Sequence, residues 1–266
     1  MREVTFRGDG FELPLLQAAV MPPRFRHGFT TRRGGVSAAP FDTLNLGGKW
    51  GDRPEAVAEN QRRLRAAAGR TEIYFATQVH GADAARVASG AAVEDIARTR
   101  ADAVIAAAPG PAVAVYVADC VPILIADVKT GAVAAVHAGW RGTVAGVLAA
   151  ALARMTEGGT QMADVRVAIG PSIGPCCFQV GPEVVAAVEA AAPGARAAGA
   201  IVERLPRPHV DLWTLNRLAA QAAGVAPDAI EVAVACTSCD GERFFSYRRD
   251  HGNTGQLAAF IACDPP

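Results

Sequence analysis

Several common signatures are missing from this sequence of 266 residues. Its apolar stretches are all interrupted by Pro, Asp or Gly before they reach the length of a membrane span, and its first ten residues hold no apolar signal-peptide core. Net charge is missing too, because 26 Lys and Arg balance 26 Asp and Glu, so no overall field attracts nucleic acid or anionic membranes. We expect a cytoplasmic protein without nucleic-acid or membrane partners, as a monomer or small homo-oligomer.

Cysteine and histidine are scarce, with six and five residues. Six cysteines in this length, two of them adjacent at 176 and 177, favour a reducing compartment over a disulfide scaffold. The CTSC segment 236–239 lacks a second CxxC to complete a zinc ribbon, and Cys176–Cys177 is a poor substitute. The sequence therefore gives little support for a functional CxxC and leaves the role of Cys236 and Cys239 open.

Hydrophobic residues make up 51% of the chain, which favours one sizeable core. Asp52 is expected to cap the first helix, with Pro54 at an early position, Glu55 in a capping box and Gly69 at the end. The apolar patterns predict helices over 54–69, 143–155, 182–191 and 211–224, strands over 73–76, 112–119, 165–170, 231–235 and 256–262, and a β-hairpin over 122–138. Hairpins mixed with strand–helix alternation predict an α/β (α+β) fold, a layered sandwich with a mixed sheet and outer helices, in one domain over residues 1–266.

The hairpin is the main clue to chemistry. Cys120 precedes its first strand and His137 closes its second, with the turn at residues 129–131. Positions equidistant from the turn lie opposite each other in an antiparallel pair, so Cys120 and His137 should meet at the open end, with Pro122 shifting the register by a residue or two. His80, in the QVHG segment, is a possible third ligand, and two imidazoles with one thiolate suit an open zinc site.

Residue types alone leave two other interpretations of this pair. His137 could be a strand-end histidine satisfied by backbone groups, with Cys120 packed as a small hydrophobic residue. Alternatively, Cys120 and His137 could act as a nucleophile and its general base. The gaps of 39 and 16 residues between His80, Cys120 and His137 match no compact zinc-finger spacing, so the three interpretations stay open at this point.

Seven short motifs occur in one order along nearly the whole chain: HGFTTRRGGVS (27–37), LNLG (44–47), QVHG (78–81), ADCVP (118–122), HAGWRGT (137–143), IGPSIGPCC (169–177) and FFSYRRD (244–250). Together they resemble the polyphenol oxidase-type, or laccase-domain, purine nucleoside phosphorylase family, some members of which are called peptidoglycan editing factors. The resemblance implies zinc at His80, Cys120 and His137 and a fold like that of cysteine-hydrolase toxins. The segment NTGQ (253–256) departs from the pattern, since an arginine is expected at position 256.

The resemblance also implies chemistry. It implies phosphorolysis of adenosine, inosine and S-methyl-5′-thioadenosine, with purine nucleoside and phosphate as partners, and deamination of adenosine. The implied catalytic residues are His80, Cys120 and His137. Asp119, next to Cys120, could orient a ligand or transfer a proton, or it could simply form hydrogen bonds within a loop. Rival functions are a cytoplasmic amidase that removes L-Ser from UDP-MurNAc-L-Ser, a non-enzymatic cell-wall protein with structural zinc, and a copper (Cu2+) polyphenol oxidase, against which the five histidines argue.

Five residues are expected to bind substrate. Arg32 is the first choice for phosphate because the glycines after it in TRRGG allow close backbone approach, although it could equally be a solvated arginine beside a tight turn. Arg248 is the second choice for phosphate. Further candidates from the motifs are Asn45, Gln78 and Arg141.

Overall fold

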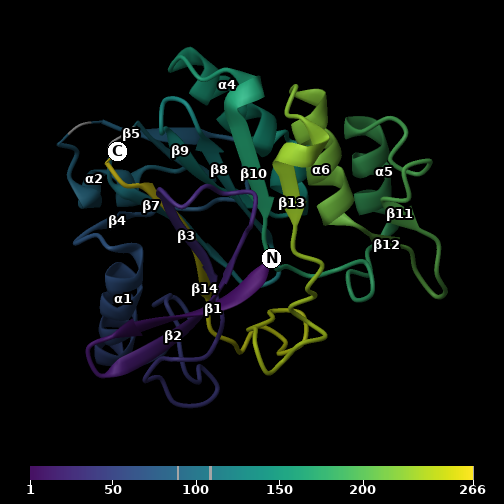
Figure 1. Cartoon of the computed structure of the whole chain (residues 1–266). Coiled ribbons are helices and arrows are strands. Elements are labelled where there is room, and N and C mark those ends of the chain that lie inside the picture. The colour runs from purple at the N-terminus through teal and green to yellow at the C-terminus, as the bar shows by residue number, and fades with distance from the viewer. Residues whose placement is uncertain (89, 108–109, 266) are drawn as a thin grey trace.

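The computed structural model describes residues 1–88, 90–107 and 110–265, and these form four layers (Figure 1). Two six-stranded sheets pack face to face in the middle. The first sheet has the order β1 (Arg2–Gly8), β2 (Phe11–Gln17), β3 (Phe25–Thr30), β14 (Leu257–Cys263), β7 (Ala112–Val117) and β4 (Ile73–Tyr74). The second has the order β13 (Ile230–Val232), β10 (Val165–Ile169), β8 (Val121–Asp127), β9 (Val133–Ala138), β6 (Ala103–Ala106) and β5 (Ala84–Val87).

Helices cover the outer faces of the two sheets. The first sheet packs against α1 (Pro54–Ala68), whose Leu64 and Ala67 share a core with residues of β2 and β14. The second sheet is covered by α3 (Trp140–Val144), α4 (Val147–Glu157), α5 (Pro182–Ala191) and α6 (Leu212–Ala222) (Figure 1). The remaining elements are α2 (Val93–Arg98), the pair β11 (Ile201–Val202) and β12 (His209–Val210), and 3₁₀ turns at Met162–Asp164 and Pro227–Ala229.

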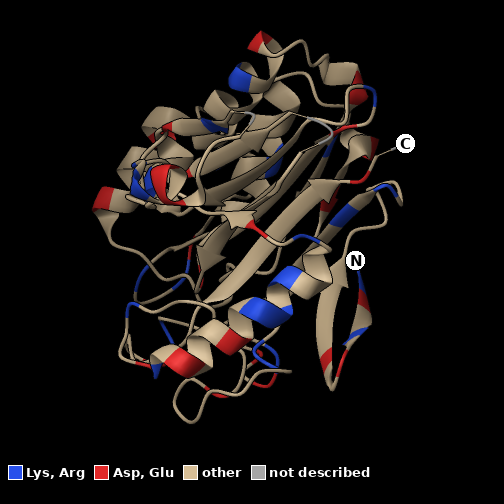
Figure 2. Ribbon diagram, turned by 90° about the vertical axis from the view of Figure 1, so that its left-hand side faces the viewer, with Lys and Arg blue, Asp and Glu red and all other residues tan. Residues whose placement is uncertain are grey.

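Strand β8 shows why the sheets lie inside. Its seven residues are all buried: Ile123 and Ile125 face the helices, while Leu124 and Ala126 face the first sheet. A strand buried on both faces reads as a continuous apolar run, and VPILIAD fits that pattern. Charged residues lie mainly on helices, loops and the first hairpin, and the central strands carry few of them (Figure 2).

Most of the predicted elements are confirmed, and the differences have local causes. The predicted helix over 143–155 is two helices, because Gly146 has φ +82° and interrupts it. Asp52 does not cap α1, since its carboxylate accepts hydrogen bonds from Ser37 and Asn45 instead. Asp211 does cap α6, by accepting the amides of residues 213 and 214.

The predicted layered α/β fold is confirmed, but two mixed sheets replace the single one expected. Each sheet combines antiparallel pairs with parallel ones, such as β4 with β7 and β10 with β13. Within the described ranges, none of the helices has the length and apolar character that a transmembrane span requires.

Candidate active site

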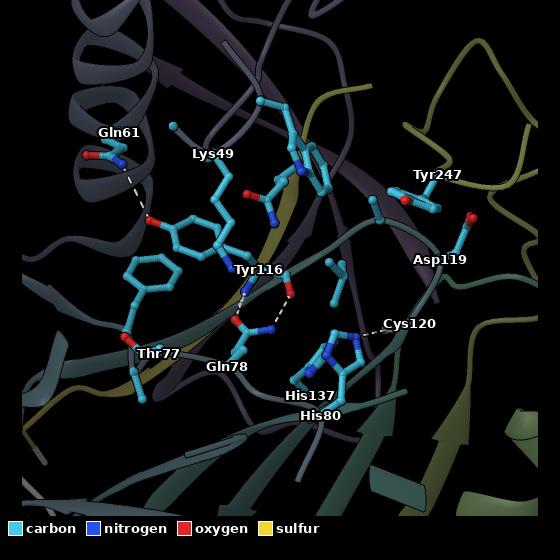
Figure 3. A pocket seen from close by; sticks show the side chains of 18 of the residues that line it. Lys49, Gln61, Thr77, Gln78, His80, Tyr116, Asp119, Cys120, His137 and Tyr247 are labelled. Carbon is cyan, nitrogen blue, oxygen red and sulfur yellow. Dashed lines mark hydrogen bonds between the residues drawn. The ribbon is translucent and has the colours of Figure 1, made fainter. Parts of the chain in front are cut away.

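Three side chains from separate parts of the chain meet at one end of the second sheet. His137 lies on β9, Cys120 directly precedes β8, and His80 lies in the loop after β4. Their ligand atoms all lie within 4.8 Å of one another, and Cys120 Sγ is 3.9 Å from His80 Nε2. The imidazole rings of His80 and His137 stand edge-on at 4.8 Å between centroids (Figure 3). The register pairs Pro122 with His137, so Cys120 lies two residues from the position directly opposite, as proline was expected to allow.

Backbone features allow these side chains to approach one another. His80 has φ +62° and Asp119 has φ +85°, left-handed conformations that non-glycine residues seldom adopt. Such strain persists only where the surrounding structure holds it, and it is typical of functional sites. Gly139 adds a close contact, because a Cβ there would lie 2.9 Å from Cys120 Sγ and 3.1 Å from His80 Cδ2.

Asp102 orients two of the three side chains. It is fully buried just before β6, and its Oδ1 accepts a hydrogen bond from His137 Nδ1 at 2.8 Å. The same carboxylate accepts the backbone amides of Val79, His80 and Gly81 at 2.7–3.1 Å. Because Nδ1 of His137 is bound to Asp102, its Nε2 is left for a ligand, an arrangement common around metal-binding histidines. Sequence reasoning missed Asp102, whose only signal was an acidic residue preceding an apolar strand.

Electrostatic interactions favour a thiolate at Cys120. Burial opposes ionisation, but the neighbouring imidazoles of His137 and His80 lower the pKa of Cys120 to about 6. Burial likewise disfavours a charged His137, yet the Cys120 sulfur and the Asp102 carboxylate raise its pKa to about 9. Both shifts favour a thiolate beside an imidazolium when no cation is bound.

A pocket of about 820 Å³ opens over these residues. His80, Cys120 and His137 all line it, so the set opens toward the pocket. Aromatic side chains form much of its wall, and Phe75 and Tyr116 stack at 4.1 Å between centroids with an interplanar angle of 8°. Three cationic side chains also line it: Lys49, Arg65 and Arg248. The pocket thus combines apolar surfaces with a few polar and charged groups, as sites for small ligands usually do.

Comparison with known proteins identifies the family of the chain. Residues 26–264 match the family model described as multi-copper polyphenol oxidoreductase laccase. The chain belongs to this laccase family. Curated relatives include a purine nucleoside phosphorylase of Deinococcus radiodurans, 39% identical over 94% of this chain and 92% of that protein. Purine nucleoside phosphorylase YfiH of Shigella flexneri is 40% identical over 87% of this chain and 91% of its own length.

Solved laccase-family structures share the fold. YlmD from Geobacillus stearothermophilus superposes with a TM-score of 0.87 at 36% identity, covering 98% of this chain and 99% of that one. The Bacillus licheniformis hypothetical protein YfiH superposes with a TM-score of 0.86 at 31% identity, covering 95% and 96%. These likenesses confirm the predicted family, and the relatives' names support an enzyme of this laccase family.

The donor set of this laccase-family chain fits a metal ion. Ideal tetrahedral zinc bonds of about 2.0–2.1 Å to nitrogen and 2.3 Å to sulfur place these atoms about 3.6 Å apart. The 3.9 Å between Cys120 Sγ and His80 Nε2 is close to that separation. With His137 Nδ1 held by Asp102, one thiolate and two imidazole nitrogens are available to a cation.

The structure brings some of the predicted site residues into the laccase-family pocket. Asp119, Gln78 and Arg248 line it beside the three ligand candidates. The Gln78 amide pairs with both backbone groups of Tyr116 at 2.8 Å, which fixes the end of β7 (Figure 3). Asp119 accepts Thr237 Oγ1 at 2.6 Å and the Arg248 amide at 2.7 Å, so both carboxylate oxygens hold protein groups.

Three other predicted residues lie outside the lining of the pocket. Arg32 donates to the Asp42 carbonyl at 2.7 Å, to the Asp42 carboxylate at 3.1 Å and to the Gly241 carbonyl at 3.0 Å. Asn45 is buried and bonds Gly47 and Gln256, which shapes the loop before Lys49. Arg141 is exposed and stacks on Trp140 at 4.4 Å. Their assignment as substrate-binding residues stays a prediction, although protein groups already occupy the guanidinium of Arg32 and the amide of Asn45.

Two cationic residues that sequence reasoning missed line the pocket. Lys49 extends from its loop into the pocket above Gln78 (Figure 3), and Arg65 projects from α1. Within the described ranges, neither side chain forms an ion pair at 4.0 Å or less. Isolated Lys and Arg residues carry no motif signal, so only the fold could identify them.

Proposed function

We propose that the chain is a zinc-dependent purine nucleoside phosphorylase acting on adenosine, inosine and S-methyl-5′-thioadenosine. The observation that carries the proposal is an open set of three ligand residues facing a pocket with aromatic and cationic walls. Its volume, about 820 Å³, falls in the range usual for small-molecule sites. The names of the relatives from Deinococcus radiodurans and Shigella flexneri support the same reaction class.

Zinc is preferred over copper for the ion at His80, Cys120 and His137. Two imidazoles and a thiolate also occur in mononuclear copper sites, which usually add a weak axial methionine. None of the four methionines of the chain lines the pocket. A multicopper oxidase needs several histidine clusters, and among the described residues the two groups able to hold a metal include only two of the five histidines. When bound, zinc supplies a Lewis acid and lowers the pKa of water.

The chain's own residues bind and orient the reactants in this proposal. The stacked Phe75 and Tyr116 offer an aromatic wall for a purine, since such rings bind other π-systems in offset or edge-on geometry. Lys49, Arg65 and Arg248 provide the positive charge that a phosphate nucleophile requires. Asp119 acts as a positioning residue, because its carboxylate holds the Arg248 backbone against the segment that carries Cys120.

The proposal also includes deamination of adenosine, which requires a different nucleophile. Water replaces phosphate as the nucleophile, so the cationic residues matter little for it, whereas the ligand residues and the aromatic wall serve both reactions. We also propose Cys120 as a ligand rather than a nucleophile, because its sulfur lies with two imidazole nitrogens in one compact set.

The test follows base release and ammonia release from adenosine with and without phosphate, on protein of known zinc content. We expect phosphate-dependent release of adenine and a sugar phosphate, and release of ammonia independent of phosphate. Inosine and S-methyl-5′-thioadenosine should also release base only with phosphate. Hydrolysis of UDP-MurNAc-L-Ser with no reaction of any nucleoside would replace the proposal with the amidase function.

A further inference from the structure

Four of the six cysteines meet at one point of the structure, away from the His80–Cys120–His137 set. The four-cysteine cluster consists of Cys176, Cys177, Cys236 and Cys239, whose sulfur atoms all lie within 4.8 Å of one another. Cys239 Sγ is 3.4 Å from the sulfur of Cys176 and 3.3 Å from that of Cys177. All four thiols are free. Cys176 and Cys177 thus supply, beside Cys236 and Cys239, the second pair of cysteines that the sequence pattern around CTSC lacks.

Two loops carry the four-cysteine cluster, and backbone hydrogen bonds fix them together. Ser172 forms a parallel bridge with Cys236, and the Thr237 amide donates to the Ser172 carbonyl at 3.0 Å. A turn over residues 237–239 folds Cys239 back toward Cys236. The Gly174 amide donates to Cys236 Sγ at 3.2 Å, an interaction that stabilises a sulfur carrying negative charge.

The spacing of the sulfur atoms suits one tetrahedral ion. Four thiolates at about 2.3 Å from zinc lie about 3.8 Å from one another. The observed separations run from 3.3 Å to the 4.8 Å limit and bracket that value. One disulfide would use only two of the four sulfur atoms, and the adjacent Cys176 and Cys177 suit no ordinary bridge with each other. Four thiols from two loops are the ligand set of closed structural zinc sites.

We propose that the four-cysteine cluster binds a second metal ion, a zinc ion held by four thiolates, separate from the ion at His80, Cys120 and His137. The metal has a structural role, because four protein ligands leave no position for substrate. It fastens the loop over 172–178 to the turn over 236–239.

This fastening acts on one wall of the pocket. Thr237, inside the CTSC segment, donates to the Asp119 carboxylate next to Cys120. Arg248 donates from its guanidinium to the carbonyls of Cys177 at 3.2 Å and Gln179 at 3.1 Å. Ile173, Phe178 and Arg248 themselves line the pocket. The metal at the four-cysteine cluster therefore holds the wall that carries Arg248 in place, without touching substrate.

Metal counting on protein purified under reducing conditions, without added metal, tests the second site. We expect two zinc ions per chain in the parent protein, one in Cys239→Ser, one in Cys120→Ala and none in the double variant. Cys239 is exposed on a turn, so its substitution should leave the fold intact by circular dichroism. Cys263→Ala is the matched control, because Cys263 lies on β14 outside both groups and should keep two ions.

The variants separate failure of this proposal from failure of the proposed function. A single zinc ion that is lost in Cys120→Ala but kept in Cys239→Ser would overturn the second site alone. A single ion with the opposite pattern would retain the second site and remove the catalytic one.

Alkylation followed by peptide mass mapping gives an independent measurement on the unmodified chain. Thiols that ligate zinc resist alkylation until a chelator removes the metal. We expect the four cysteines of the cluster to be protected in native protein and to react after chelation, with the melting temperature falling by several degrees. Rapid alkylation of all four before chelation, or a disulfide among them in freshly reduced protein, would overturn the proposal.

Discussion

The Asp102 carboxylate accepts a hydrogen bond from His137 Nδ1 at 2.8 Å and three more from backbone amides of the loop that carries His80. One buried side chain therefore sets both the ring orientation of one ligand and the loop position of another. Asp102 is therefore positioned to orient two of the three candidate ligands of a metal ion.

Asp102→Asn should weaken zinc binding about 10–100-fold, the usual effect of removing such a partner of a ligating histidine. The amide keeps one acceptor but places a donor against backbone amides that also donate. Zinc affinity is measured by competition with a chelator. Asp127→Asn is the matched control: Asp127 is equally buried and accepts Lys129 and Thr130 in the β8–β9 turn, so that variant should lose stability but keep zinc affinity.

Gly139→Ala should also lower zinc affinity, by a steric route. The backbone of Gly139 (φ −65°, ψ 170°) accepts any residue, but the added methyl group would press on Cys120 and His80. Gly81→Ala serves as control, because its methyl group would meet Val79 and Asp102 at an ordinary 3.5–3.6 Å. Equal zinc affinity in both variants would contradict the packing argument.

Zinc removal should expose Cys120 as a reactive thiolate. Its pKa of about 6 lies below the ordinary value of about 8.5 because the imidazoles of His137 and His80 outweigh the effect of burial. The alkylation rate of the zinc-free protein should rise with pH through an inflection near 6 and stay flat above it. His137→Ala should move the inflection upward. An inflection near 8.5 in the parent protein would show that the ion pair does not form.

Phosphate dependence should follow the cationic residues of the pocket. Lys49→Ala removes a positive charge that lies free in the pocket, so the KM for phosphate should rise about tenfold, the equivalent of about 1.4 kcal/mol for one charge-assisted contact. Ammonia release from adenosine should change much less. Arg32→Lys is the comparison: we expect lower thermal stability, from loss of bonds to Asp42 and Gly241, with an unchanged phosphate KM. The reverse pattern would return Arg32 to the role expected from sequence.

Periodicity and turn chemistry allow much of the fold to be predicted. Helix α1 begins at Pro54 and ends before Gly69, which has φ +62°, as its sequence indicates. The β8–β9 hairpin brings Cys120 toward His137 because its turn residues fix the register. Local patterns of this kind involve residues a few positions apart, so they can be interpreted from the sequence without knowledge of the tertiary fold. The assignment of one domain to residues 1–266 stays a prediction.

Features that depend on distant contacts could not be predicted. Asp102 looks like any acidic residue before a strand, and its role appears only when β6 places it beside His137. The motif around Arg32 suggests anion binding, yet the fold brings Asp42 close, and the Arg32 guanidinium donates a hydrogen bond to its carboxylate. The four-cysteine cluster joins segments about 60 residues apart in sequence, a separation that no spacing rule covers.

The place of β14 in the first sheet has a consequence for synthesis of the chain. Strand β14 lies between β3 and β7, and the residue before it, Gln256, lines the pocket. Until residues 257–263 leave the ribosome, β3 and β7 have no common neighbour, and the apolar face that pairs the two sheets stays incompletely covered. Such non-local strand pairing is slow and exposes surface that aggregates. The nascent chain should therefore expose this apolar face until β14 is inserted between β3 and β7.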